Sequence, residues 1–155
     1  MSELRSVLLA IDVAAQRRDS ASQELGHAER AQRHAQQQLD QLESYAAETS
    51  AKWTRNAAQG TAPELMFHHF QFMERLHHAI GLQRKAIGDA AVQVAAAKAV
   101  LLEAEFRLMR LRQLLKTKRR ELDAAQARRE QKQMDEFATH QYLRSAGRRL
   151  YGELS

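Results

Sequence analysis

Cysteine is absent from this chain of 155 residues, and proline occurs only once. Without cysteine there is no disulfide, no thiolate nucleophile and no cysteine-ligated zinc site, a composition that fits a reducing compartment. Aromatic residues make up only 6% of the chain and glycine occurs six times, whereas Ala, Gln, Arg, Leu and Glu dominate. This bias is typical of long helices rather than of an ordinary globular core.

A long hydrophobic run is also missing. The first fifteen residues mix Glu3, Arg5 and Asp12 into an apolar pattern, so they differ from a secretory signal peptide. No segment approaches the roughly 20 consecutive apolar residues that a membrane-spanning helix needs. We therefore expect a soluble, cytoplasmic protein.

The features of an active site are equally scarce. No nucleophile, base and orienting group can be placed together, and there is no glycine-rich phosphate loop, so we expect neither an enzyme nor a cofactor. The chain does have four closely placed histidines, which are His68, His69, His77 and His78. Their spacings lack the steps of three or four residues that bring ligands together on a helix, so we expect no metal site.

What the chain does have is a long hydrophobic repeat between Leu76 and Ala125. Alternating steps of four and three residues meet apolar side chains at thirteen of fifteen positions, the exceptions being Gln83 and Lys118. A mean spacing of 3.5 residues keeps one apolar stripe on one side of a helix. The stripe is about seven heptads long and predicts a coiled coil.

A first repeat precedes it, from Leu4 to Trp53, and is apolar at eleven of fifteen positions. Its early members are Leu4, Leu8, Ile11, Ala15, Arg18, Ser22, Leu25 and Ala28. Two successive steps of three, from Ser22 to Leu25 and from Leu25 to Ala28, break the alternation. Such a break predicts a locally overwound supercoil.

Between the two repeats lies the strongest helix-breaking cluster, Gln59–Pro63. Gly60 suits the residue after a helix end, and Pro63 suits the first turn of the next helix. We therefore predict a first helix at about 3–58, a turn at 59–63, and a second helical arm at about 64–143 followed by a frayed tail. Because a short connection implies antiparallel neighbours, the predicted fold is all-α, a long antiparallel two-helix coiled-coil hairpin forming a single domain over 1–155.

The two arms are unequal in length, which leaves two arrangements open near the turn. If the chain folds back at Gly60, Leu4 lies opposite a residue near 117, and everything later overhangs. Residues 64–80 either begin the second arm or form a short extra helix at the tip, in which case the arm starts near Gly81. Phe67, Phe70 and Phe72 exceed what a two-helix seam can bury, which favours a docking surface there.

The net charge of +5 is unevenly placed. Residues 107–149 carry thirteen basic and five acidic side chains, a net of +8. Such a cluster suits nucleic acid, an anionic membrane or an acidic protein surface. Because the basic residues alternate with acidic ones beside an antiparallel seam, unlike a basic region outside a parallel zipper, we expect no nucleic acid as partner. A basic nucleic-acid-binding coiled coil and a structural coiled-coil spacer remain alternatives.

The basic third also contains a recognisable motif. Arg129-Glu130-Gln131-Lys132, followed by Met134-Asp135-Glu136-Phe137-Ala138, resembles the C-terminal signature of the flagellar FliJ family. Gln38-Leu39, Leu42, Tyr45 and Glu48 resemble the end of that family's first helix. Phe72, Leu76, Ala79-Ile80 and Gln83 resemble the start of its second helix. The resemblance covers residues 1 to about 140 and implies the hairpin fold.

The resemblance implies a soluble stalk component of flagellar type III protein export, located at the cytoplasmic base of the flagellum. Members of the family sit in the central hole of the hexameric export ATPase and promote its activity. They also contact the cytoplasmic domain of the membrane export-gate protein and handle export chaperones. The protein would thus be peripheral to the membrane.

Site residues are carried over by position. The gate contact would use a surface near the hairpin end formed by Gln38, Leu42, Tyr45, Phe72, Leu76 and Ala79. The ATPase contact would use Arg128, Arg129, Glu130, Gln131, Lys132, Asp135 and Glu136. This sequence departs from the family at Thr49, where an aromatic is common, and at Gln83, where a histidine can occur. Leu42 and Leu76 also fall in the predicted seam, although the family's contact requires them to be at least partly exposed.

Overall fold

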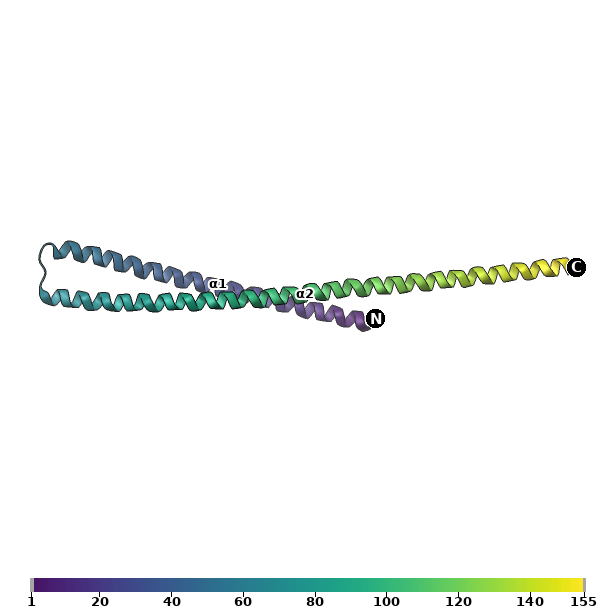
Figure 1. Cartoon of the computed structure of the whole chain (residues 1–155), viewed down its shortest axis with the longest axis horizontal. Helices are drawn as coiled ribbons and strands as arrows, with labels where there is room; N and C mark the ends of the chain where they lie inside the picture. The colour runs from purple at the N-terminus through teal and green to yellow at the C-terminus, as the bar shows by residue number, and fades with distance from the viewer. Residues whose placement is uncertain (1, 155) are drawn as a thin grey trace. The chain divides into compact units, whose positions relative to one another are not determined.

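The computed structural model describes residues 2–154 and contains two helices, α1 (Ser2–Ala57) and α2 (Pro63–Leu154), with no strand among these residues. The helices form an antiparallel coiled-coil hairpin, as the sequence predicts (Figure 1). Packing divides the chain into two units: one comprises residues 14–107, and the other comprises residues 2–13 with 108–154. Each unit is described by itself below.

The reversal of the chain is a five-residue turn at 58–62. Gly60 has a φ of 93°, in the left-handed region that favours glycine, and its N–H donates to the carbonyl oxygen of Ala57 at 3.1 Å. Pro63 is the first residue of α2, where its missing N–H costs nothing because that position has no intrahelical acceptor. Met66 N–H then donates to the carbonyl of Ala62 at 3.2 Å, which completes the first helical turn.

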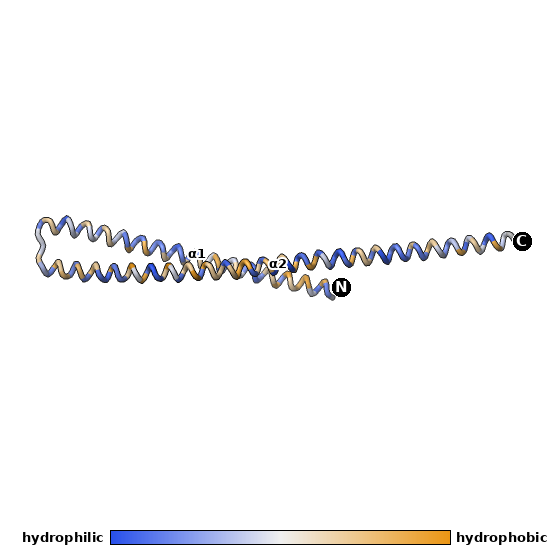
Figure 2. Tube along the Cα trace, in the orientation of Figure 1, coloured by the Kyte–Doolittle hydropathy of each residue, from blue (hydrophilic) through white to orange (hydrophobic). Residues whose placement is uncertain are grey.

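In the unit formed by residues 14–107, the core is the seam between the helices. Its buried cluster consists of Leu39, Ala46, Leu76 and Ile80, with Leu42, Met73 and Ile87 packed against it. Every position of the predicted stripe from Leu76 to Lys118 is buried or half-buried, which confirms the heptad repeat of the second helix. Figure 2 shows hydrophobic and hydrophilic residues alternating along both helices, as expected when only one side of each helix is covered.

The predicted break in the first repeat is wrong. Ala14 and Ala21 are buried and Val7 is half-buried, whereas Leu8 and Ser22 are exposed. With positions 7, 14 and 21 in place of 8, 15 and 22, steps of three and four alternate without interruption from position 4 to position 53. Adjacent small residues such as Ala14 and Ala15 fit either heptad frame in the sequence. Leu8 is larger than Val7, and this favoured the incorrect frame, which contains Leu8.

Residues 64–80 begin α2 rather than forming a separate tip helix, because α2 is continuous through Gly81 and Gly88. Each glycine costs a helix about 1 kcal/mol relative to alanine, and burial of the neighbouring seam residues Ile80 and Ile87 offsets that cost. The tail beyond residue 143 also differs from the expectation. It is helical as far as Leu154 rather than frayed.

In the unit formed by residues 2–13 and 108–154, α1 covers only the first part of α2. Leu108 is the most deeply buried residue there, and Lys118 Nζ lies 3.5 Å from Glu3 Oε2. This ion pair agrees with the count that places Leu4 opposite a residue near 117. Because α1 begins at Ser2, the predicted seam position Leu122 lies past the covered part and is 46% exposed.

Near the turn, the seam closes with an aromatic stack. The rings of Trp53 on α1 and His69 on α2 are parallel within 5°, with centroids 4.1 Å apart, and both residues are half-buried. Trp53 is the only tryptophan, so its fluorescence reports on this contact. His69→Ala should uncover the indole and shift its emission to longer wavelength. His68→Ala, which alters an exposed neighbour, should leave the emission maximum unchanged, and equal shifts would contradict the stack.

Candidate functional site

Three residues from each helix form the surface that the family resemblance indicates, here called the tip patch. Its members are Gln38, Leu42 and Tyr45 on α1 and Phe72, Leu76 and Ala79 on α2. In each helix they are four and three residues apart, which places them on one side of that helix. Tyr45 and Phe72 join the two sides in an edge-to-face contact, with centroids 6.0 Å apart and an interplanar angle of 82°.

The six residues of the tip patch are not equally accessible. Tyr45 and Phe72 are 51% and 40% exposed, and Gln38 is also exposed, so these three offer contact area to a partner. Leu42 is half-buried against the core cluster, and Leu76 is a buried member of it. The expectation that Leu76 is at least partly exposed is therefore not met. Leu76 helps to hold the two helices together in the core cluster and is only 8% exposed.

Gln83 organises the edge of the tip patch. Its Nε2 donates to the carbonyl oxygen of Ala35 at 2.8 Å and to Oε1 of Gln38 at 3.2 Å, both across the seam. Gln38 is thereby held in place by a residue on the other helix. From the sequence, Gln83 is a polar exception in the apolar stripe, part of the resemblance to the family's second helix, and a departure where a histidine can occur, with no contact assigned to it. Its polar side chain at a stripe position was the available signal, because such residues often set the register of a coiled coil.

An ion pair between Arg84 on α2 and Glu43 on α1 lies next to the Gln83 contact. Arg84 Nη2 donates to Glu43 Oε1 at 2.9 Å, and both side chains are substantially exposed. Such an exposed pair contributes at most about 1 kcal/mol of stability. Together with Gln83, however, it opposes a slip of one helix along the other, which would misalign Tyr45 and Phe72.

The second predicted site lies on α2 between Arg128 and Glu136, where every residue is exposed. Helical spacing puts Arg128, Arg129 and Lys132 on one face. Two acidic residues nearby accept hydrogen bonds from glutamines on the same helix: Gln126 donates to Glu130 at 3.2 Å and Gln131 donates to Asp135 at 3.1 Å. Asp135 and Glu136 share the same side of the helix, so Arg128, Arg129 and Lys132, here called the basic face, leave it with a net charge of only +1. This exposed surface suits a partner whose acidic groups approach the three basic side chains.

Metal-ligating side chains are scattered over the described part of the chain rather than clustered. Among residues 2–154, no three His, Asp or Glu side chains are placed to hold one metal ion, and no polar or charged residue is buried. His69 is occupied in its stack with Trp53. None of the described helices is apolar over a long enough stretch to span a bilayer.

Comparison with known proteins gives a clear family relationship. No curated protein and no solved structure matches the chain. The model of the FliJ family, described as flagellar FliJ protein, matches residues 3–147. The match covers α1 from residue 3, the turn, α2 as far as residue 147, the tip patch and the basic face. The chain therefore belongs to the flagellar FliJ family, and its role is related to flagellar export.

Proposed function

We propose that this protein is a stalk component of the flagellar type III export apparatus that works by binding rather than catalysis. In this role it binds the hexameric export ATPase through residues 128–136 and the cytoplasmic domain of the membrane export-gate protein through the tip patch. It also assists export chaperones. The site of action is the cytoplasmic base of the flagellum, peripheral to the membrane.

The observation that carries this proposal is the pair of exposed rings, Tyr45 and Phe72, brought together from two helices of a family member. Solvent-exposed aromatic rings on a firmly packed support are typical anchors of protein interfaces, because they bury a large area at little entropic cost. A coiled coil that serves only as a spacer has no need for such rings beside a polar contact like that of Gln38 with Gln83.

The gate contact is tested with a double variant, Tyr45→Ala with Phe72→Ala. Since an anchoring aromatic contributes about 1–2 kcal/mol or more, affinity for the cytoplasmic domain of the gate protein should fall at least about tenfold, as measured by calorimetry.

The matched control is Leu102→Ala with Phe106→Ala. These residues are 54% and 50% exposed, lie on the same helix as Phe72, and do not belong to the tip patch. The control should bind like the unaltered protein. Equal losses in both variants would refute the tip patch as the gate-binding surface, and absence of binding by the unaltered protein would favour a structural spacer.

A further inference from the structure

The end of α2 has a charge pattern that the export contacts do not explain. Between Glu136 and Glu153 there are sixteen residues without an acidic side chain, and they include Arg144, Arg148 and Arg149. All three arginines are exposed. The segment 139–151, here called the C-terminal segment, is helical throughout.

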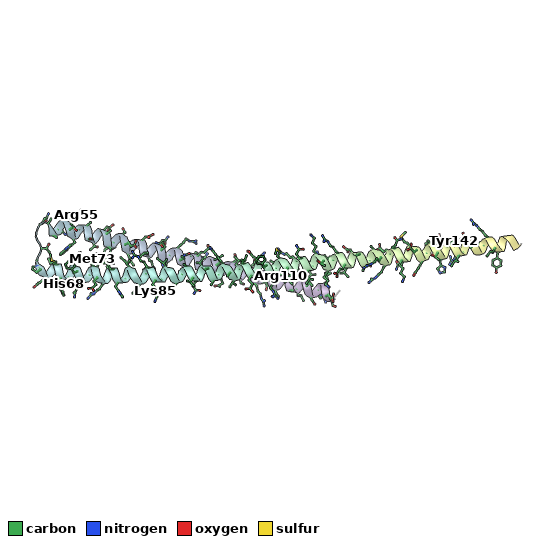
Figure 3. All side chains as sticks on the ribbon, in the orientation of Figure 1. Arg55, His68, Met73, Lys85, Arg110 and Tyr142 are labelled. Carbon is green, nitrogen blue, oxygen red and sulfur yellow. The ribbon has the colours of Figure 1, made fainter. Side chains whose placement is uncertain are left out.

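The C-terminal segment is also amphipathic. Its apolar face consists of Thr139, Tyr142, Leu143, Ala146 and Leu150. At 100° per residue these five lie within an arc of about 100°. Tyr142 is 73% exposed, and Leu143 and Leu150 are each 61% exposed (Figure 3 labels Tyr142).

The apolar face has a sharp beginning. One and two turns earlier, the same side of α2 carries Lys132, Asp135 and Glu136, so the face starts only after Glu136. Arg149 borders the apolar face beside Tyr142, and Arg144 and Arg148 lie on the other side of the helix. A helix is about 10 Å across, so all three guanidinium groups remain within about one Debye length of a surface that the apolar face touches.

A helical protein partner fits this segment poorly. Leu143, Ala146 and Leu150 continue the stripe of the coiled coil in phase, but the stripe positions before them are Arg129, Lys132 and Glu136. A partner helix would therefore find only about two apolar heptads, whereas a recognisable coiled coil needs three or four. Nucleic acid would use the arginines but leave exposed leucine and tyrosine side chains without a role.

A bilayer surface uses both features at once. The apolar face of an interfacial helix enters the boundary between headgroups and acyl chains, while basic side chains contact anionic phosphates. Tyrosine is favoured at that depth because its ring is apolar and its hydroxyl stays hydrated. We propose that the C-terminal segment binds the surface of membranes rich in anionic phospholipid, a contact separate from those with the ATPase and the gate.

The test is flotation of the full-length protein with vesicles of phosphatidylethanolamine and phosphatidylglycerol, compared with vesicles of phosphatidylcholine alone. Binding should require the anionic lipid and weaken as salt is added, because it combines a small apolar face with three positive charges. Equal binding to both vesicle types, or no binding to either, would overturn the proposal.

Two variants separate the apolar and the basic contributions. Arg144→Gln, Arg148→Gln and Arg149→Gln together should lower the partition coefficient about 100-fold, at about fivefold for each arginine. Leu143→Gln with Leu150→Gln should lower it at least about tenfold, since two leucine side chains no longer enter the interface. Glutamine keeps the helix propensity, and circular dichroism should confirm unchanged helix content.

Matched controls come from the same helix. Met134→Gln with Phe137→Gln removes two equally exposed apolar side chains outside the apolar face, and the basic control is Arg112→Gln, Lys116→Gln and Arg119→Gln. The apolar control should leave vesicle binding unchanged, and the basic control should lower it by less than tenfold. Full binding by the leucine variant, together with equal affinity for duplex DNA, would show a general polyanion contact and overturn the proposal.

Discussion

Replacing Ile80 by Asp should destabilise the hairpin by about 4 kcal/mol, a large part of the 5–15 kcal/mol that holds a typical domain folded. Ile80 is 5% exposed and sits in the core cluster with Leu39, Ala46 and Leu76. The substitution removes about 3 kcal/mol of burial and adds the cost of a carboxylate facing an apolar seam. Two helices have little other core to compensate for the loss.

The effect of Ile80→Asp is measured by urea unfolding followed through the fluorescence of Trp53, which lies in the same unit. The control is Leu82→Asp, two residues away on the exposed side, where Leu82 is 58% exposed. It should change the free energy of unfolding by less than about 0.5 kcal/mol. Similar unfolding midpoints for the two variants would mean that the seam does not hold the hairpin together.

Reversing three charges, Arg128→Glu, Arg129→Glu and Lys132→Glu, should abolish most stimulation of the hexameric export ATPase at low salt. The three side chains share one exposed face of α2, where a partner's carboxylates can approach them together. At about 1 kcal/mol for each reversed charge, apparent affinity falls about 100-fold, largely through slower association. The measurement is steady-state ATP hydrolysis against concentration of this protein.

A control with the same net charge separates a local contact from long-range attraction. Arg33→Glu, Lys85→Glu and Lys98→Glu alter three exposed residues in the other unit. Both triple variants change the net charge by six, from +5 to −1. Only the variant at 128–132 should lose stimulation, and stimulation by the unaltered protein should decline as salt increases. Unchanged stimulation by that variant at low salt would count against the basic face.

How far the sequence predicted this structure depends on the size of the residues involved. In the second repeat, bulky Leu, Ile and Val side chains occupy eight of the thirteen stripe positions from Leu76 to Lys118. All thirteen positions are buried or half-buried, so the predicted frame is confirmed there. In the first repeat, Ala14 and Ala15 are adjacent and equally small. The frame there depends on which alanine lets the opposite helix approach, and periodicity alone carries no such information.

The candidate sites were also predicted only in part from the sequence. Helical spacing was enough to place the three members of the tip patch in each helix on one side, and to place Arg128, Arg129 and Lys132 together. Spacing could not show that Leu76 is buried in the core cluster, that Gln83 donates to Gln38, or that His69 stacks on Trp53. These contacts join residues 16 to 45 positions apart, so they depend on the pairing of the helices.

The sequence by itself determined the helices, the turn at Gly60, the antiparallel pairing and the point near Lys118 where α1 no longer covers α2. These features follow from local helix propensity, the hydrophobic period and the length of each helix, all of which can be read from the sequence of a single chain. Only the tertiary structure decided the heptad frame of α1, the continuity of α2 past Gly81, and which side chains are covered. Those outcomes depend on how closely two particular helix surfaces pack, and that is a property of the pair.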